Sequence, residues 1–337
     1  MNVSKSSRGV GSRITVADTV ARKIGLRRAA EMRVLYLESD NTTQDYLRTY
    51  ERFWGDVGEA VCIDDVTEGD VMLFLNRMKE VPWRVLKSGE KKMRKPKTLD
   101  NMWIALSSLW TWALERGYVR ENVVRLVPRP KVNEEPIIPL TTDEVLALFR
   151  ACEYGRTYHN DPFKRNRRLA AARDKALVAL MVETGLRVSE VVNLRVDDVV
   201  FARAGGRVHV HLGKGKKSRY VPFQRRCARM LTEWRAECEL EPWFFYNVRR
   251  NVGMQMLRKN VAGTVSALGK RAGIAVSPHK LRTTAFCMMV KNGMTAWQLK
   301  EIAGHSDIRT TQRYVRAAEI DLEGAMRRAS PLDSVRM

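Results

Sequence analysis

The chain has 337 residues and an ordinary hydrophobic fraction of 45%, a length that suits two domains, each with its own core. Its 60 Lys and Arg against 38 Asp and Glu leave a formal net charge of +22, which favours a polyanionic partner, although a ribosome-associated or peripheral membrane protein stays open. The lack of an 18-residue apolar run argues against a membrane protein, and the polar N-terminus argues against secretion. The five cysteines are scattered, which argues against disulfides and against a zinc site.

A basic tail and a helical domain are expected in the first part of the chain. Residues 1–26 are rich in Ser, Gly, Arg and Lys and predict a flexible tail. Residues 27–126 then carry apolar side chains at helical spacings of three and four. Three helices are expected: one capped near residues 41–43, one after residues 64–67, and one over residues 98–116. Their apolar faces are Tyr46, Leu47, Tyr50, Phe53 and Trp54; Val71, Met72, Leu75 and Met78; and Trp103, Leu106, Trp110 and Ala113.

Residues 84–97 form a strongly basic segment between the second and third of these helices. It holds seven Lys or Arg and one acid, Glu90. Pro82, Gly89 and Pro96 argue against a continuous helix, so we expect a loop. A solvated loop is one interpretation, but the overall positive charge favours a loop that contacts DNA phosphates. The residues predicted to bind DNA in this segment are Lys91, Lys92, Arg94 and Lys95.

A proline-rich linker, residues 127–139, precedes a second domain at residues 140–337. Three prolines within ten residues favour an extended chain in the linker. Residues 141–144 can cap a new helix. A further helix is expected over residues 174–184, where Gly185 stops it, and the next helix begins almost at once.

The apolar period in the second domain changes to two after Arg207. Apolar and polar side chains then alternate, which is typical of a half-buried strand. Residues 213–217 supply a turn and residues 219–222 a returning strand. We therefore expect a mainly α fold with a small antiparallel β-sheet in this domain. The alternating residues are Val208, His209, Val210, His211 and Leu212.

Four short segments of the second domain stand out when they are taken together. They are residues 184–190 (TGLRVSE), 213–219 (GKGKKSR), 277–282 (SPHKLR) and 304–307 (GHSD), with Tyr314 nine residues after the histidine of the last segment. Each has an ordinary explanation alone: a surface arginine, a hairpin turn, structural histidines and a partly buried aromatic residue. The combination in this order needs a common explanation.

In this order and spacing, the four segments resemble the tyrosine recombinase family, which includes phage integrases and Xer-type recombinases. The resemblance extends from about residue 30 onward. It implies a two-domain, C-shaped clamp around duplex DNA, with residues 27–126 as the core-binding domain and residues 140–337 as the catalytic domain. Two positions depart from the family pattern, since Thr283 stands where many members have histidine and Glu121-Asn122-Val123 where many have Asn-Pro.

The resemblance also implies the roles of single residues. Tyr314 takes the place of the nucleophile, and Glu190 that of the acid supporting the first catalytic arginine. Arg219, which follows the hairpin turn, joins the residues predicted to bind DNA. The implied catalytic residues are Arg187, Lys214, His279, Arg282, His305 and Tyr314.

Phosphodiester exchange is chemically consistent with this set. Two guanidiniums can grip the non-bridging oxygens of a phosphate, and no carboxylate cluster suggests a metal site, so we expect neither a metal nor another cofactor. Lys214 is the candidate acid for the 5′-alkoxide, and His305 the candidate hydrogen-bond donor to the phosphate. His279 could accept the tyrosine proton or bind the phosphate. Surrounding cations favour the phenolate of Tyr314, and its 3′-phosphotyrosyl link conserves bond energy, so that rejoining needs no ATP.

We therefore expect a site-specific DNA recombinase, an integrase of a mobile element, acting as a homotetramer on two DNA duplexes. An accessory directionality factor could assist it, in the cytoplasm or on the nucleoid of a prokaryote. The alternatives are an Xer-type resolvase of chromosome or plasmid dimers, a non-catalytic DNA-binding protein of the same fold, and a type IB topoisomerase. Apolar Ala317, Ile320 and Met326 beyond the tyrosine could pack within the chain or on a neighbouring protomer.

Overall fold

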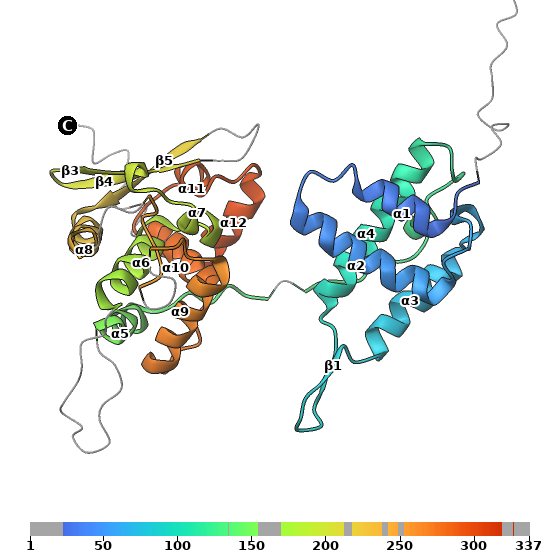
Figure 1. The fold of residues 1–337 in the computed structure, drawn as a ribbon, viewed down its shortest axis with the longest axis horizontal. Coiled ribbons are helices and arrows are strands. Elements are labelled where there is room, and N and C mark those ends of the chain that lie inside the picture. Colours follow the sequence, from blue (N-terminus) through green and yellow to red (C-terminus); the bar gives the residue numbers. More distant parts are fainter. Residues whose placement is uncertain are drawn as a thin grey trace, which may run out of the picture. The chain divides into compact units, whose positions relative to one another are not determined.

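The computed structural model describes residues 23–133, 135–153, 170–211, 218–237, 242–248, 253–318 and 326. The chain divides into two compact units, Met1–Glu135 and Pro136–Met337, each with its own hydrophobic core (Figure 1). The prediction of a mainly helical chain with a small antiparallel sheet in the second domain is confirmed, and the first unit has a two-stranded sheet that was not predicted. Among the described helices, none combines the length and the apolar content that a membrane span requires.

The described part of the first unit consists of four α-helices around one core. Like α2, helix α4 contacts each of the other three helices of this unit. Ten of its 20 residues are buried, and Pro96 occupies its first turn, where the missing N–H costs no hydrogen bond. The helices are α1 (Leu26–Val34), α2 (Asp40–Val57), α3 (Glu68–Glu80) and α4 (Pro96–Glu115).

Aromatic side chains fill the centre of this first core. Phe53 meets Phe74 and Trp110 edge to face, with ring centroids 5.1 and 5.8 Å apart, and all three are almost completely buried. Trp110 is therefore a core residue and not a platform for base stacking, as its helical spacing indicates. One predicted position is wrong: Met72 is 44% exposed, and Phe74 takes its place on the buried face of α3.

The first unit begins before residue 27. The backbone N–H of Leu26 donates to the carbonyl of Val61, and the N–H of Ile63 donates to the carbonyl of Ile24. These bonds tie the start of α1 to the chain after α2, and Leu26 is buried in the core. Helix α1 itself was not predicted, because its nine residues carry few large apolar side chains.

The basic segment predicted as a loop is a short β-hairpin. Strand β1 (Arg84–Val85) pairs antiparallel with β2 (Lys91–Lys92). Gly89, at φ 80°, provides the left-handed residue that follows the turn in a short hairpin loop, and its N–H donates to the carbonyl of Leu86. The hairpin is visible at the lower end of the unit in Figure 1.

The second unit combines helices with a three-stranded antiparallel sheet in the order β3-β4-β5. The short strand β3 was not predicted, since four residues are too few to establish a period of two. The strands are β3 (Val199–Ala202), β4 (Gly205–Val210) and β5 (Arg219–Gln224). The helices are α5 (Thr142–Glu153), α6 (Ala171–Thr184), α7 (Val188–Val192), α8 (Arg225–Ala236), α9 (Arg258–Ala272), α10 (Pro278–Lys291), α11 (Ala296–Ala303) and α12 (Ile308–Ala317).

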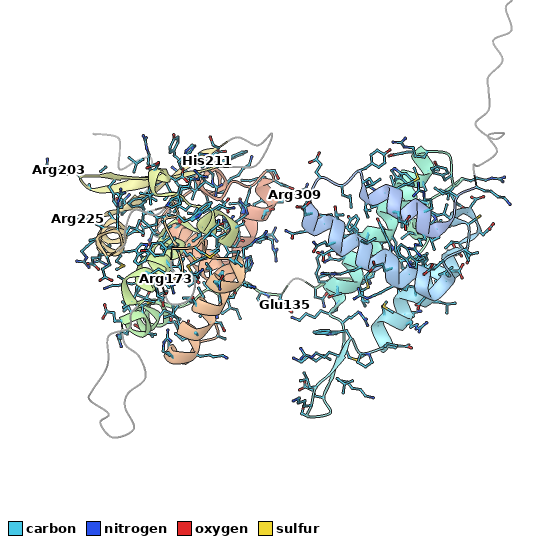
Figure 2. The ribbon with its side chains drawn as sticks, viewed as in Figure 1. Glu135, Arg173, Arg203, His211, Arg225 and Arg309 are labelled. Atoms are coloured by element: carbon cyan, nitrogen blue, oxygen red, sulfur yellow. The ribbon has the colours of Figure 1, made fainter. Side chains whose placement is uncertain are left out.

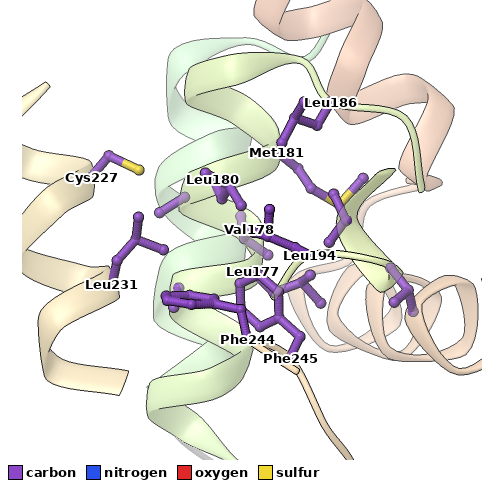
Figure 3. Close-up of a cluster of buried hydrophobic side chains, with 14 of the residues drawn as sticks. Leu177, Val178, Leu180, Met181, Leu186, Leu194, Cys227, Leu231, Phe244 and Phe245 are labelled. Carbon is purple, nitrogen blue, oxygen red and sulfur yellow. The ribbon is translucent and has the colours of Figure 1, made fainter. Parts of the chain in front are cut away.

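Helix α6 runs through the core of this unit. Eleven of its 14 residues are buried, so it is enclosed on nearly all sides. Figure 3 shows Leu177 and Leu180 of this helix beside Phe244 and Phe245, with Leu231 of α8 facing them. Burial of each such side chain contributes about 2 kcal/mol to the stability of the fold. Because α6 is held in this way along its length, it gives firm support to the chain that follows it.

Some expected features lie outside the described residues. These are the tail residues 1–22, the turn 213–217 with Lys214, and Ile320. Of the apolar residues expected beyond Tyr314, Ala317 belongs to α12 and Met326 is 67% exposed.

Candidate active site

A cleft of about 970 Å³ in the second unit collects most of the residues that the sequence singled out. Its walls come from α7, α10, α12, the sheet and the segment after α11. Lys214 lies outside the described residues, and the predicted DNA-binding residues 91–95 belong to the first unit. The predicted residues that line the cleft are Arg187, Glu190, His279, Arg282, His305 and Tyr314.

The turn between α6 and α7 positions Arg187. Gly185 ends α6 in the left-handed conformation at φ 63°, and a Cβ there would lie 2.3 Å from the ring of Phe286. Only glycine allows this close approach. The chain therefore turns at once, and Arg187 becomes the N-cap of α7. Its side chain is 39% exposed, so that part of the guanidinium faces the cleft.

Glu190 joins two arginines at the wall of the cleft. Its Oε1 accepts from Nη1 of Arg187 at 3.1 Å, and both oxygens accept from the Arg219 guanidinium, at 2.9 and 3.0 Å. Burial by itself would raise the pKa of Glu190, but the bonds to Arg219 and Arg187 outweigh it and hold the pKa below its usual value. The carboxylate is therefore ionised at neutral pH.

Arg219 has a different place from the DNA contact that the sequence predicted. Its side chain is only 11% exposed, and its Nε donates to the carbonyl of Ile302 at 2.8 Å. The two Nη atoms are engaged by Glu190 in a bidentate pair. Arg219 thus holds Glu190 and the end of α11, and its guanidinium is directed into the protein.

The C-terminal end of α11 binds three guanidiniums. Arg187 donates to the carbonyls of Ala303 and Gly304, Arg282 also donates to Ala303, and Arg219 donates to Ile302. The last carbonyls of a helix lack partners within the helix and carry its partial negative charge, so they suit cations. Gly304, at φ 61°, ends the helix, and a Cβ there would lie 2.9 Å from the guanidinium of Arg219.

Arg282 is the least exposed of the predicted site residues that line the cleft. It is 5% exposed, and its guanidinium donates to the carbonyl of Gly185 and stands 4.5 Å from the centre of the Phe286 ring. Burial, followed by repulsion from Arg187, lowers the pKa of Arg282 to about 10. Arg282 therefore stays charged at neutral pH. Its hydrogen-bond partners among the described residues are two backbone carbonyls and His305, and none of them is a carboxylate.

His305 is held at both ring nitrogens. Its Nε2 lies 3.0 Å from Nη2 of Arg282, and its Nδ1 lies 3.0 Å from Oγ1 of Thr311, which is fully buried. Because a guanidinium only donates, Nε2 accepts, and the ring proton is assigned to Nδ1. Burial and the neighbouring arginines lower the pKa of His305 to about 4, so the ring is neutral at pH 7. In the free protein, Nε2 therefore carries no proton that it could donate to a phosphate.

Tyr314 lies on α12 beside these groups and is 7% exposed. Its ring is nearly parallel to that of His305, with centroids 6.2 Å apart, and it meets the ring of Phe286 edge to face, with centroids 5.0 Å apart. Phe286 thus contacts Tyr314, His305 and Arg282, and it follows Arg282 by one helical turn. His279 lies in the first turn of α10, exposed at the rim of the cleft.

Some cations of the basic hairpin segment in the first unit bind groups of the protein itself, and others are exposed to solvent. Arg94 donates to the carbonyls of Met78 and Val81 at 3.1 and 2.7 Å, which anchors the hairpin to the end of α3. Lys95 pairs with Glu135 at 3.2 Å. Lys91 and Lys92 on β2 are both exposed, so they are the cations of this group best placed for an external anion.

Several residues that shape the cleft could not be recognised from the sequence. Phe286 and Thr311 have no motif, and the role of Ala303 rests on its backbone carbonyl, which any residue would supply. The sequence does show that Phe286 follows Arg282 by one helical turn and that Thr311 follows His305 by six residues. Only the three-dimensional arrangement gives those spacings a meaning.

Comparison with known proteins gives consistent matches. Residues 126–320 match the phage integrase family. Tyrosine recombinase XerC of Corynebacterium efficiens is 30% identical over 278 residues, which cover 81% of this chain and 81% of that protein. Tyrosine recombinase XerA of Pyrococcus furiosus is 33% identical over 164 residues, which cover 48% of this chain and 57% of that protein.

Solved structures with a similar fold include two integrases. The lambda integrase dimer bound to a COC′ core site has a TM-score of 0.65 at 17% identity, covering 89% of this chain and 80% of that one. The Tn1549 transposon integrase in complex with transposon right end DNA has a TM-score of 0.68 at 18% identity, covering 92% and 100%. At these identities, the likeness establishes the fold.

We predict that Glu190→Gln lowers the free energy of unfolding of the full chain by about 3 kcal/mol, because removing one partner of a buried ion pair leaves the other charge uncompensated. Glu190 is 8% exposed and compensates both Arg187 and Arg219. Denaturant unfolding measures the change. The matched control is Glu233→Gln, which removes an exposed pair with Arg229 and should change the stability by less than about 0.5 kcal/mol. Equal values for the two variants would contradict the prediction.

We predict that His305 makes the second unit less stable as the pH falls from about 6.5 towards 4. The folded-state pKa of His305 is about 4, so the unfolded chain takes up a proton first and stability is lost on acidification. Urea unfolding at stepped pH should give a shallower decline for His305→Gln than for the wild type. Identical slopes for the wild type and His305→Gln would refute the assignment.

Proposed function

The chain belongs to the phage integrase family of tyrosine recombinases, enzymes that cleave and rejoin DNA, and from this premise we propose that Tyr314 is its nucleophile. In this proposal the phenolate oxygen of Tyr314 attacks the phosphorus of one DNA strand. The bond from phosphorus to the 5′-oxygen breaks, and the strand remains joined to the enzyme through a 3′-phosphotyrosyl link. Attack by a 5′-hydroxyl of another strand reverses these steps and releases the tyrosine.

The observation that carries the proposal is the convergence of three guanidiniums beside Tyr314 with one carboxylate among them. Glu190 compensates one of the three charges, and the C-terminus of α11 compensates part of the rest. The excess positive charge suits a phosphodiester, which gains negative charge as the nucleophile attacks. Arg187 and Arg282 are proposed to hold the non-bridging oxygens, because both line the cleft.

His305 needs a change of protonation before it can donate to the phosphate. Burial, and after it repulsion from Arg282 and Arg187, keeps the pKa of His305 low. A phosphate between the two arginines would offset the repulsion. We therefore propose that substrate binding itself makes His305 a donor, through proton uptake or a shift of the ring proton to Nε2. Thr311 would keep the ring in place during this change.

The remaining proton transfers involve His279 and Lys214. His279 lies at the rim of the cleft in the first turn of α10 and is proposed to accept the tyrosine proton or to bind the phosphate. Lys214 is proposed to protonate the leaving 5′-oxygen, on the family resemblance alone, since it lies outside the described residues. This scheme uses neither a metal ion nor ATP.

We further propose that both units contact the same DNA duplex and that exposed Lys91 and Lys92 bind its backbone. Exchange between two duplexes would need four copies of the chain, with an accessory factor setting its direction, in the cytoplasm or on the nucleoid. The charge of +22 and the basic hairpin favour an integrase of a mobile element. The Xer-type relatives keep dimer resolution as the second candidate.

We predict that Tyr314→Phe abolishes the covalent adduct that the wild type forms with a nicked suicide duplex of its recombination site. The substitution removes one oxygen and preserves the ring contacts with His305 and Phe286. Denaturing gel electrophoresis of labelled DNA measures the adduct. Tyr36→Phe, which removes the hydroxyl of an exposed tyrosine in the first unit, should leave the adduct yield unchanged.

The same assay separates the alternatives. If the wild type binds the site but forms no adduct, the chain is a non-catalytic DNA-binding protein and the proposal fails. If it relaxes plasmids freely without any defined site, topoisomerase chemistry replaces recombination.

A further inference from the structure

Asp198, His209 and His211 form a cluster of potential metal ligands on the sheet side of the cleft. Their ligand atoms all lie within 4.8 Å of one another, and all three residues line the cleft. The two histidines are two residues apart at the end of β4, so their side chains project from the same face of the strand. Figure 2 labels His211 at the sheet end of the unit.

The carboxylate of Asp198 is oriented before any ligand arrives. It is 6% exposed as a residue, and its Oδ2 accepts from the backbone N–H of Arg195 at 2.9 Å. Its Oδ1 lies 2.6 Å from Nε2 of His211. A ligand whose direction is set by a second hydrogen bond loses little freedom when it binds a metal, which favours affinity.

The two imidazoles are also arranged as a pair. The ring of His209 stacks on Tyr220 with centroids 4.6 Å apart and an angle of 16°, and the rings of His209 and His211 are 4.1 Å apart. The guanidinium of Arg207 lies 4.8 Å from the centre of the Tyr220 ring. Tyr220 therefore fixes the plane of His209 next to His211.

We propose that Asp198, His209 and His211 bind a divalent cation of the zinc class. Two imidazole nitrogens and one carboxylate oxygen suit Zn²⁺, Co²⁺ or Ni²⁺, whereas Ca²⁺ and Mg²⁺ prefer sites made of oxygen atoms. Two donors bound at about 2.1 Å can be at most about 4.2 Å apart. The ligand atoms, which all lie within 4.8 Å of one another, are close to that limit.

This site is separate from the proposed catalytic set, because none of its three ligands takes part in the cleavage scheme. Three protein ligands leave a coordination position open for water or another oxygen. If the cleft receives DNA, as the proposed function requires, that position is available to a phosphate oxygen, and the cation adds positive charge to the cleft wall. Binding of the cation itself does not depend on the recombinase reaction.

The test measures the binding of Zn²⁺ alone to the full chain after treatment with a chelator, by isothermal titration calorimetry, with Co²⁺ absorption as a second readout. We expect the wild type to bind one equivalent that His209→Ala/His211→Ala loses. Asp198→Asn keeps an acceptor for Arg195 and should weaken this equivalent by more than about tenfold, since even a residue that only orients a ligand contributes that much. Asp197→Asn, which changes the exposed acid that precedes Asp198 and is not one of the three ligands, should bind like the wild type.

The comparison of variants decides the outcome. If the double variant binds as many equivalents of zinc as the wild type, the zinc is held elsewhere, for example by cysteines, and the proposal is overturned. Absence of any saturable equivalent in the wild type, with far-UV circular dichroism unchanged, would overturn it as well. If the double variant loses DNA affinity equally in zinc and in chelator without losing a metal equivalent, the histidines bind phosphate directly and the proposal is wrong. Loss of zinc binding by a double variant that retains DNA binding would support the site whether or not the cleavage reaction is found.

Discussion

The structure of the second unit depends on holding three guanidiniums close together in a partly buried cleft. Like charges repel and each loses hydration on burial, so such a cluster is unstable without compensation. Glu190 provides one full negative charge to Arg187 and Arg219, and the carbonyls at the end of α11 provide the partial charge of a helix C-terminus. One carboxylate and the partial charge of a helix terminus do not fully compensate three guanidiniums, and we propose that the remaining positive charge attracts a phosphate.

The surrounding fold holds these guanidiniums in position. Buried helix α6 ends at Gly185, whose missing side chain leaves room for Phe286. Phe286 in turn supports Arg282 from below and packs against the rings of His305 and Tyr314. One aromatic side chain therefore contacts both a cation proposed to bind phosphate and the proposed nucleophile, so a change of its packing should alter the distance between them.

The sequence predicts most of the elements, because helix caps and apolar spacings are local signals. Thr141 caps its helix as expected, the helix expected after residues 64–67 begins at Glu68, and Trp110 of α4 packs in the core. The cap expected at residues 41–43 is wrong, because these residues lie inside α2, whose N-cap is Ser39. The missed elements, α1 and β3, are short, and their stability comes from partners distant in the chain. The motifs identify which residues could meet in the cleft. They do not distinguish Arg219, which faces Glu190, from Arg187, which faces the cleft, because that difference depends on packing between β5 and α11.

A crystal structure of the Tyr314→Phe protein on an intact duplex of its recombination site tests this account most directly. We expect the guanidiniums of Arg187 and Arg282 to lie within about 3.2 Å of the non-bridging oxygens of one phosphate. Arg219 remains on Glu190, and the ring of residue 314 lies beside that phosphate. A phosphate bound by Arg219, or one held away from residue 314, would contradict the account.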